Sequence, residues 1–345
     1  MPHRVANKAR PRGDMMNVLL TGAAGFIGCH TALRFLERGD QVLGIDNLND
    51  YYPTSLKHDR LALLHAHKGF RFQHIDVARR DLAEKIGGEA TDADVIVHLA
   101  AQAGVRYSVE NPFAYVDSNV TGQVAMFEMA ARLPKRPPVV YASSSSVYGA
   151  AETVPFVETA RADAPVSVYA ATKRAGELLA HAYGDLYGIR SSGLRFFTVY
   201  GRYGRPDMAP WLFTEAILKG NPISVFNNGE MQRDFTHISD IVDGVVAAAD
   251  RIVADPTGTA PIYNLGNNSP VMLLDFIAAI EKAAGRTAIM NMKPKPAGDV
   301  LRTFADISLA ERDLGFRPKT RLEDGMADFV DWFRTYPSLN VGKHS

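Results

Sequence analysis

The stretch Thr21-Gly22-Ala23-Ala24-Gly25-Phe26-Ile27-Gly28 decides the fold of this chain, because it joins a short apolar run to an amphipathic segment. The apolar run at residues 18–20 predicts a strand, and the residues after the glycines predict a helix. Gly22 allows a sharp turn, Gly25 lets the backbone approach a pyrophosphate, and Gly28 lets the helix pack closely on the sheet. The pattern predicts a dinucleotide-binding turn, and a glycine-rich turn without a ligand is the alternative.

An acidic residue follows the next strand-like run and supports the ligand-binding interpretation. Residues 41–45 form this strand-like run, and Asp46 comes directly after them, where a carboxylate hydrogen-bonds the ribose diol of a bound dinucleotide. An acid at this place favours NAD over NADP, because a 2′-phosphate would meet a like charge. The three residues that follow directly, Asn47-Leu48-Asn49, include no arginine to pair with such a phosphate. We therefore expect NAD as the cofactor.

Composition excludes several classes of protein. Lys plus Arg and Asp plus Glu number 38 each, so no net charge attracts nucleic acid or a membrane surface. The single cysteine, Cys29, cannot form an internal disulfide, and no Cys/His spacing of a metal site occurs. A reducing compartment is the simplest interpretation, and we predict a cytoplasmic protein without a metal.

The chain contains no segment typical of membrane insertion or secretion. No apolar run reaches the ~20 residues of a membrane helix. Residues 1–14 carry basic residues but no apolar core of a signal peptide, and we predict that they are disordered. Met1, Met15 and Met16 are alternative translation starts.

Strand and helix signals alternate through the first two hundred residues, a pattern typical of a parallel sheet covered on both faces. The predicted strands are 17–20, 41–45, 70–75, 95–99, 139–142 and 190–197, and the clearest predicted helices are 25–38, 113–132 and 167–187. We expect an α/β protein with a Rossmann-like, doubly wound parallel sheet and a smaller mixed α/β substrate lobe.

The composition changes after Gly201, where glycine and proline become denser and the elements shorter. A helix at 241–253 and a strand at 262–265 fit the larger sheet. We predict that residues 15–199 form the NAD-binding domain with 236–265 returning to it. Residues 200–235 and 266–338 would then form the substrate lobe.

Tyr169 and Lys173 are four residues apart in a predicted helix, so both side chains lie on one helical face. An ammonium beside a phenol favours the phenolate and lowers the tyrosine pKa, which would make Tyr169 a general base. The pair follows the fifth strand and its exit, Ser143-Ser144-Ser145-Ser146, at the edge where open α/β sheets bind ligands. Position, more than spacing, makes this pair a candidate for catalysis.

These motifs together resemble the extended short-chain dehydrogenase/reductases of the NAD-dependent epimerase/dehydratase family, and the resemblance covers nearly the whole chain. The motifs in family order are Thr21-Gly-x-x-Gly-x-x-Gly28, His98-Leu99-Ala100-Ala101, Asn119-Val120-x-Gly122, the serine run with Val147-Tyr148-Gly149, and Tyr169-x-x-x-Lys173. The resemblance implies that Tyr169 is the base, that Lys173 binds the nicotinamide ribose and tunes the tyrosine, and that Ser144 hydrogen-bonds the substrate hydroxyl.

The same resemblance implies a cofactor site along the first four strands and the catalytic helix. Asp76 and Val77 would contact the adenine, and Asn119 would anchor the backbone of the active site. The implied cofactor-binding residues are Gly22, Gly25, Phe26, Ile27, Gly28, Asp46, Asn47, Asp76, Val77, Leu99, Ala100, Ala101, Asn119, Tyr169, Lys173 and Phe196.

The second half of the chain resembles the nucleotide-sugar epimerases in three segments: Arg195 to Gly201, Gly204-Arg205-Pro206-Asp207-Met208, and Gln232 to Asp240. Residues 101–108, Ala-Gln-Ala-Gly-Val-Arg-Tyr-Ser, are similar to the UDP-glucuronate 4-epimerases in particular. This similarity implies interconversion of UDP-glucuronate and UDP-galacturonate by oxidation at C4, rotation of the 4-keto sugar and re-reduction.

A substrate site follows from this subfamily resemblance. It implies that Arg233 faces the diphosphate, that Asp299 binds the uridine ribose, and that Val225 and Phe226 contact the uracil. Hydroxyl side chains would surround the sugar carboxylate, with Arg205 nearby. The implied substrate-binding residues are Arg106, Ser144, Ser145, Ser146, Thr198, Arg205, Val225, Phe226, Arg233 and Asp299. Two segments depart from the subfamily pattern: Arg202-Tyr203 replaces the usual Pro-Trp, and residues 295–299 deviate before Asp299.

Other members of the same fold remain alternatives. The 4,6-dehydratases and UDP-glucuronate decarboxylases carry an acid just before Val-Tyr-Gly, where this chain has Ser145 and Ser146, which argues against dehydration. Decarboxylation stays open, because a 4-keto uronate loses carbon dioxide with little help. Thr198 stands where UDP-glucose/UDP-galactose 4-epimerases carry Asn, which argues against that alternative. A non-catalytic NAD-binding sensor would not need Tyr169 together with Lys173.

The partners predicted from the sequence are a UDP-sugar substrate and a second copy of the chain. The predicted helices at 113–132 and 167–187 are apolar on more than one face, so one sheet face cannot cover them. We expect a homodimer that buries these helices against their copies, as the family resemblance also implies.

Overall fold

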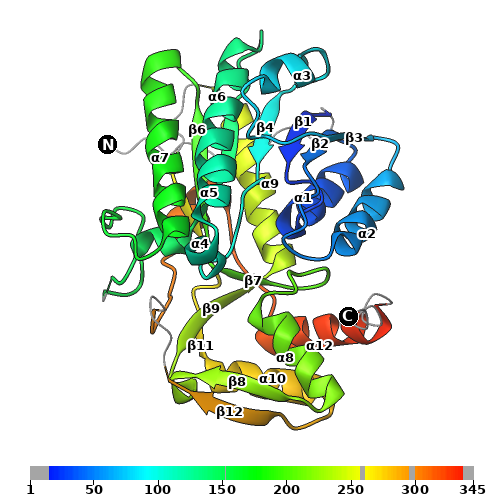
Figure 1. Ribbon diagram of the computed structural model, residues 1–345. Coiled ribbons are helices and arrows are strands. Elements are labelled where there is room, and N and C mark those ends of the chain that lie inside the picture. Colours follow the sequence, from blue (N-terminus) through cyan, green and yellow to red (C-terminus); the bar gives the residue numbers. More distant parts are fainter. Residues whose placement is uncertain (1–14, 152, 257–260, 295–299, 337–345) are drawn as a thin grey trace.

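A parallel sheet of seven strands forms the larger lobe of the computed structural model, which describes residues 15–151, 153–256, 261–294 and 300–336 (Figure 1). The strand order is β10-β6-β5-β4-β1-β2-β3, and neighbouring strands are parallel throughout. The order reverses between β1 and β4, which is where open α/β sheets bind their ligands. The strands are β1 (Asn17–Thr21), β2 (Gln41–Asp46), β3 (Phe70–His74), β4 (Val95–His98), β5 (Val139–Ser144), β6 (Ser191–Phe196) and β10 (Tyr263–Leu265).

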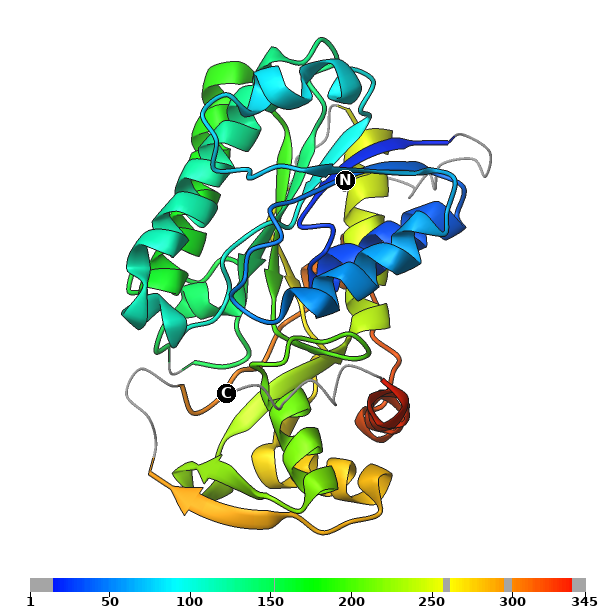
Figure 2. The ribbon, with the colours of Figure 1, turned by 45° about the vertical axis from the view of Figure 1, so that its right-hand side comes forward.

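Helices cover both faces of this sheet (Figure 2). One face carries α1 (Phe26–Glu37), α2 (Thr54–His65) and α9 (Ile238–Ala254), and the other carries α3 (Leu82–Ala90), α6 (Gly122–Arg132) and α7 (Val168–Tyr187). Successive side chains of a strand point to opposite faces. Val18 and Leu20 accordingly join one core, and Leu19 joins the other. This doubly wound arrangement confirms the predicted fold class.

The predicted helix at 113–132 is interrupted. Its residues form α5 (Pro112–Tyr115), a π-helical turn η1 (Val116–Thr121) and α6, preceded by the short α4 (Tyr107–Glu110). A π turn changes the direction of the side chains that follow it, and such turns are frequent at functional sites. Here η1 contains Asn119.

The smaller lobe lies beyond the carboxyl ends of the large sheet and contains two small sheets (Figure 1). Its core includes a close stack of Phe235 on Phe276, with ring centroids 4.0 Å apart. The strands are β7 (Thr198–Tyr200), β9 (Gln232–His237) and β11 (Pro270–Met272) in one sheet, and β8 (Pro222–Phe226) and β12 (Ile289–Lys293) in the other. The helical segments are α8 (Ala209–Lys219), η3 (Asn227–Gly229), α10 (Leu273–Ala284) and α12 (Leu322–Thr335).

One helix from the range predicted for the substrate lobe packs on the larger lobe. The helix α11 (Ser308–Leu314) lies within the range assigned to the substrate lobe, but it packs against α9 and β10 of the larger lobe. Ala310 and the following Phe316 are buried in the core under α9, because these apolar residues complete that face of the sheet. In the described parts of the chain, no helix is long and apolar enough to cross a membrane.

Candidate functional site

The glycine turn after β1 has the geometry that close approach to a ligand requires. Gly22 has a φ of +74°, which favours glycine, and a Cβ on Gly28 would lie only 1.9 Å from the carbonyl oxygen of Gly22. Gly25 caps α1 without a side chain, so the first N–H groups of the helix are available to an anion. The turn fits the pyrophosphate of a dinucleotide.

A cavity of about 1250 Å³ runs from this turn along the carboxyl ends of the strands and into the smaller lobe. Its volume exceeds the range of about 300–1000 Å³ that is typical of a site for one small ligand. It therefore has room for a dinucleotide and a second molecule. Of the predicted site residues, those that line it are Gly22, Gly25, Phe26, Ile27, Gly28, Asp46, Asn47, Asp76, Val77, Leu99, Ala100, Ala101, Arg106, Ser144, Ser145, Ser146, Tyr169, Lys173, Phe196, Thr198, Arg205, Phe226 and Arg233.

Asp46 ends β2 at the cavity wall and is buried. Its carboxylate accepts backbone N–H groups from Ala24, at 3.1 Å, and from Leu48, at 2.8 Å. The Lys57 ammonium lies 4.0 Å from Asp46 Oδ1. Since the carboxylate bonds the glycine turn directly, Asp46 couples the turn to the second strand, at the place predicted for the ribose.

Asn119 does not line the cavity, in contrast to the other predicted cofactor residues. Its side chain is buried, where Oδ1 accepts the Gln102 N–H at 2.8 Å and Nδ2 donates to Gln102 O and Thr172 Oγ1, both at 3.0 Å. Thr172 in turn donates to the carbonyl oxygen of Tyr169 at 2.8 Å. Asn119 therefore positions the loop after β4 and the first turn of α7.

Val225 is a predicted uridine-binding residue whose side chain does not line the cavity. The side chain of Val225 is fully buried in the core of the smaller lobe, whereas Ser224 and Phe226 line the cavity. Alternate residues of β8 face opposite sides, so the Val225 side chain points away from the cavity. The predicted contact of this residue with uracil stays a prediction, and it would have to come from the backbone. Asp299 lies outside the described residues.

Tyr169 and Lys173 lie on one face of α7, as their spacing predicts. The Lys173 ammonium donates to the carbonyl oxygen of Ala142 at 3.0 Å and lies 6.0 Å from the centroid of the Tyr169 ring. The side chains of Ser144 and Tyr169 hydrogen-bond each other. Base, ammonium and serine therefore meet at the exit of β5.

The electrostatics of this pair differ from the sequence-based expectation. Burial raises the pKa of the Tyr169 phenol above its usual range, although the hydrogen bond with Ser144 and the charge of Arg205 oppose that effect. Burial also lowers the pKa of the Lys173 ammonium to about 8. The expected lowering of the Tyr169 pKa by Lys173 is not found in the protein alone, because the loss of hydration dominates and the charge that opposes it is that of Arg205.

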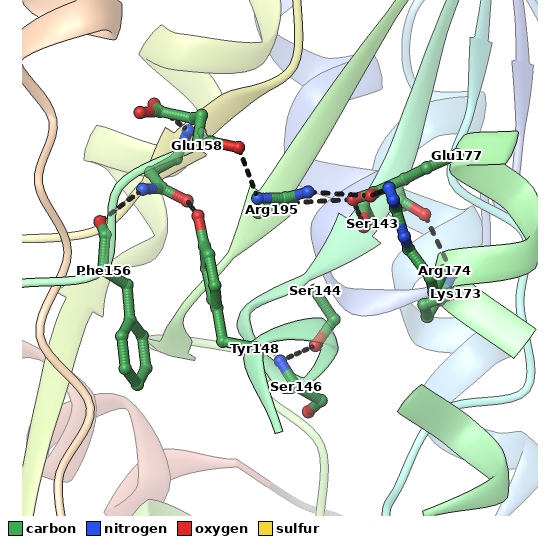
Figure 3. Close-up of polar contacts among 12 residues, drawn as sticks. Ser143, Ser144, Ser146, Tyr148, Phe156, Glu158, Lys173, Arg174, Glu177 and Arg195 are labelled. Atoms are coloured by element: carbon green, nitrogen blue, oxygen red, sulfur yellow. Dashed lines mark hydrogen bonds and ion pairs between the residues drawn. The ribbon is translucent and has the colours of Figure 1, made fainter. Parts of the chain in front are cut away.

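A buried ion pair supports the serine exit from behind (Figure 3). Arg195 of β6 donates to both carboxylate oxygens of Glu177 of α7, each at 2.8 Å, and Ser143 donates to the same carboxylate at 2.6 Å. The guanidinium lies 4.7 Å from the centroid of the Tyr148 ring. These contacts fix α7 against β5 and β6, on which the serines depend for their position.

The serine exit itself is a short 3₁₀ turn, η2 (Ser145–Tyr148). Ser144 caps this turn by accepting the Ser146 N–H at 3.1 Å (Figure 3). Thr198 begins β7 and lines the same cavity. Three hydroxyl side chains, Ser145, Ser146 and Thr198, are therefore available around one space.

Two arginines predicted to bind the substrate, Arg106 and Arg233, also line the cavity. Arg106 comes from the larger lobe, and its guanidinium carbon lies 5.0 Å from the centroid of the Phe226 ring of the smaller lobe. Arg233 donates to the carbonyl oxygens of Gln232, at 3.0 Å, and of Leu301, at 3.2 Å. Both cations are placed to bind a ligand that spans the lobes.

The cavity is also lined by residues that the sequence interpretation did not assign to the site, among them Tyr51, Lys57, Gln102 and Asp207. Lys57 had a detectable signal, since it occupies the same face of α2 as the apolar Leu61 and is buried. Gln102 and Asp207 lie within two of the quoted motifs but were given no role there. Tyr51 had no signal, because it lies in a loop that meets the other residues only in the folded chain. Among the described residues, no group of three or more His, Cys, Asp or Glu side chains could hold a metal ion.

Comparisons with a family model, with protein sequences and with solved structures all match this chain to epimerases. A model of the NAD-dependent epimerase/dehydratase family matches residues 18–266. UDP-glucuronate 4-epimerase 2 of Arabidopsis thaliana is 46% identical over 96% of this chain and 79% of its own length. The probable UDP-glucuronate 4-epimerase of Rhizobium meliloti (strain 1021) is 44% identical over 92% of this chain and 97% of its own. A crystal structure of UDP-glucuronic acid 4-epimerase from Bacillus cereus, in complex with UDP-glucuronic acid and NAD, matches with a TM-score of 0.84, 33% identity and coverage of 92% and 99%.

Replacing Lys173 by methionine tests the energetic consequence of its burial. Between about pH 8, the folded-state pKa, and 10.5, the ordinary value, the unfolded chain binds a proton that the folded chain lacks. The stability of the native protein therefore rises with pH relative to Lys173→Met across this window. We expect the difference in free energy of unfolding, Lys173→Met minus native, to fall by about 2 kcal/mol between pH 7 and pH 9.5. Urea unfolding at both pH values measures it, and a difference that stays constant contradicts the interpretation.

Proposed function

Because this chain belongs to the NAD-dependent epimerase/dehydratase family, we propose that it is an isomerase that interconverts UDP-glucuronate and UDP-galacturonate. The family match confirms the resemblance inferred from the motifs. The observation that carries the specific reaction is the pairing of Tyr169 with Ser144 in a cavity whose adjoining turn presents hydroxyls, at Ser145 and Ser146, and no carboxylate. NAD fits the glycine turn and Asp46, which would hold its pyrophosphate and its adenosine ribose.

The catalytic groups of the chain perform proton transfer at C4. Tyr169 takes the proton of the C4 hydroxyl, Ser144 hydrogen-bonds that hydroxyl, and Lys173 is placed beside the phenol. NAD, when bound, supplies reversible hydride transfer at C4 and a positive charge that favours the phenolate. Since Arg205 already opposes the effect of burial on the pKa of Tyr169, a further cation at the nicotinamide position acts in the same direction.

Epimerisation requires the 4-keto sugar to present its other face before the hydride returns. The diphosphate and uridine must stay bound while the sugar turns. Arg233, Arg106 and Phe226 line the cavity, with Arg106 beside the Phe226 ring, and they can hold that end of the ligand. Only the sugar then changes its orientation.

The carboxylate of a uronate makes a side reaction, decarboxylation, possible at the 4-keto stage. Oxidation at C4 makes the sugar a β-keto acid, which loses carbon dioxide when the bond to the carboxylate aligns with the carbonyl π system. Hydrogen bonds from Ser145, Ser146 and Thr198 would hold the carboxylate so that this bond stays near the carbonyl plane. Such a clamp separates an epimerase from a decarboxylase in the same fold.

The chain also presents apolar side chains that the monomer leaves uncovered. Phe113 of α5 and Leu186 of α7 are 76% and 74% exposed, and Leu178 of α7 is 55% exposed. The helices α5 and α7 contact each other, and both lie on the outer side of the large sheet (Figure 1). We infer a homodimer through this helical surface. The cytoplasmic location stays a prediction from the cysteine content.

The proposed function is tested by incubating the protein with UDP-glucuronate and resolving the products by chromatography. We expect UDP-galacturonate to form without net consumption of NAD, because the same carbon is oxidised and reduced. Tyr169→Phe should lose most of the turnover while UDP-sugar affinity stays within a few-fold. Conversion of UDP-glucose but not UDP-glucuronate, or UDP-pentose as the main product, contradicts the proposal.

Replacing Ser145, Ser146 or Thr198 singly, by alanine or valine, tests the clamp in the same assay. Each hydrogen bond to a charged acceptor contributes about 1.5–3 kcal/mol, so losing one should raise the ratio of 4-keto-pentose product to UDP-galacturonate about tenfold or more. A ratio that never rises in variants that still turn over would show that these hydroxyls serve only the loop backbone.

Light scattering tests the dimer. The native protein should show twice the mass of one chain at micromolar concentration, and Leu186→Glu should shift the mass toward that of one chain. Ile289→Glu provides the control, because Ile289 is also an exposed apolar residue but lies on β12 of the smaller lobe. A monomeric native protein refutes the proposal.

A further inference from the structure

Arg205 is engaged by a carboxylate of its own chain. Its Nε donates to Asp207 Oδ1 at 3.0 Å, and its Nη2 donates to Asp207 Oδ2 at 2.5 Å, so the pair is bidentate. Both side chains are largely shielded from water, with exposed fractions of 19% and 29%, and both residues line the cavity. A guanidinium and a carboxylate in this arrangement form one of the stronger polar contacts of a protein.

A tyrosine from the other lobe completes the contact. Tyr51 lies in the loop after β2 and donates its hydroxyl to Asp207 Oδ2 at 3.0 Å. Its ring packs on Tyr107, with centroids 4.7 Å apart. Asp207 therefore receives hydrogen bonds from both lobes of the protein at once.

Gly104 has no side chain, and this absence provides the space in which Tyr51, Asp207 and Arg205 meet. It has a φ of +111°, and a Cβ at this position would lie 2.9 Å from the Tyr51 hydroxyl and 3.3 Å from Arg205 Nη2. No other residue type fits there without displacing one of them. The chain thus keeps Tyr51, Asp207 and Arg205 together beside the cavity.

The guanidinium lies near the reacting groups: Arg205 and Tyr169 line the same cavity. Tyr115 links them, because a Cβ on Gly104 would lie 3.3 Å from Arg205 Nη2 and 3.5 Å from the Tyr115 hydroxyl, and the Tyr115 and Tyr169 ring centroids are 6.0 Å apart. However, Asp207 already accepts two hydrogen bonds from this guanidinium. A second carboxylate entering the cavity can bind Arg205 fully only by taking the place of Asp207.

We propose that Asp207 is an internal carboxylate that holds Arg205, together with Tyr51, until the carboxylate of a uronate replaces it. This inference rests on the proposed function and names the device that selects uronates over neutral sugars. When a uronate binds, its carboxylate replaces the Asp207 carboxylate on the Arg205 guanidinium. A neutral hexose has only a hydroxymethyl group at that position, which cannot displace an anion, so Arg205 stays paired with Asp207.

The exchange reduces the apparent affinity of the native protein for its own substrate. If Arg205 is free of Asp207 for about a tenth of the time, the apparent dissociation constant is raised about tenfold over that of a permanently free arginine. Removing the competing charge removes this penalty for a uronate alone.

The test measures ligand binding by calorimetry in the NAD-containing protein. Tyr169→Phe serves as the background, so that the ligands are not converted during the titration. Adding Asp207→Asn, which keeps the shape and removes the charge, should tighten UDP-glucuronate binding about tenfold. UDP-glucose, the matched ligand without a carboxylate, should bind as before. Tyr51→Phe should tighten UDP-glucuronate binding by a smaller factor, because it weakens the hold on Asp207.

Asp328→Asn is the control for the loss of one negative charge. Asp328 pairs with Arg202, only three residues from Arg205, but this pair is exposed and does not line the cavity. We expect no change in the binding of either ligand. The inference is overturned if Asp207→Asn leaves UDP-glucuronate binding unchanged, weakens it, tightens both ligands equally, or acts no differently from Asp328→Asn.

Failure of the inference and failure of the proposed function give different results. If the native protein makes UDP-galacturonate but Asp207→Asn does not tighten UDP-glucuronate binding, the exchange is wrong and the function stands. If the native protein does not convert UDP-glucuronate, the proposed function itself is wrong.

Discussion

The buried ion pair between Glu177 and Arg195 is the contact on which the catalytic edge of this protein depends. Glu177 follows Lys173 by one turn and Tyr169 by two turns of α7, and Arg195 lies on β6 beside the strand that ends in the serines. The carboxylate receives two bonds from Arg195, one from Ser143 and one from Arg174. A buried pair is tolerated only when its hydrogen bonds are satisfied, and these are. One rigid contact thus sets the distance between base and serine.

Burial determines the protonation of the catalytic residues that this ion pair holds in place. It raises the pKa of Tyr169 and lowers the pKa of Lys173, so both groups tend toward their neutral forms. The charges that favour the phenolate come from Arg205 and from the cofactor position, and the first of these is tempered by Asp207. The site is therefore controlled by which anions and cations occupy it. That dependence fits a reaction in which a bound cofactor is required and a carboxylate-bearing sugar is selected.

The features predicted from the sequence were those that short segments encode by themselves. The glycine turn and the Tyr169–Lys173 pair depend on spacing within one strand–turn–helix or one helix, so the sequence carries their geometry. Features that depend on tertiary packing were missed or misplaced. The Tyr51–Asp207 contact joins loops 156 residues apart, and the orientation of Val225 depends on the register of β8. The pKa of Tyr169 depends on how deeply α7 is buried, which no local pattern states.

The central claim is that this chain oxidises and reduces the same sugar carbon while NAD stays bound. Incubation of the NAD-containing protein with UDP-glucuronate deuterated at both C4 and C5, in ordinary water and with excess unlabelled NADH, tests it most directly. The account predicts UDP-galacturonate that retains the deuterium at C4 and takes up no solvent hydrogen at C5, as mass spectrometry and NMR would show. Product that has lost the label at C4, or has exchanged its hydrogen at C5, would contradict the account.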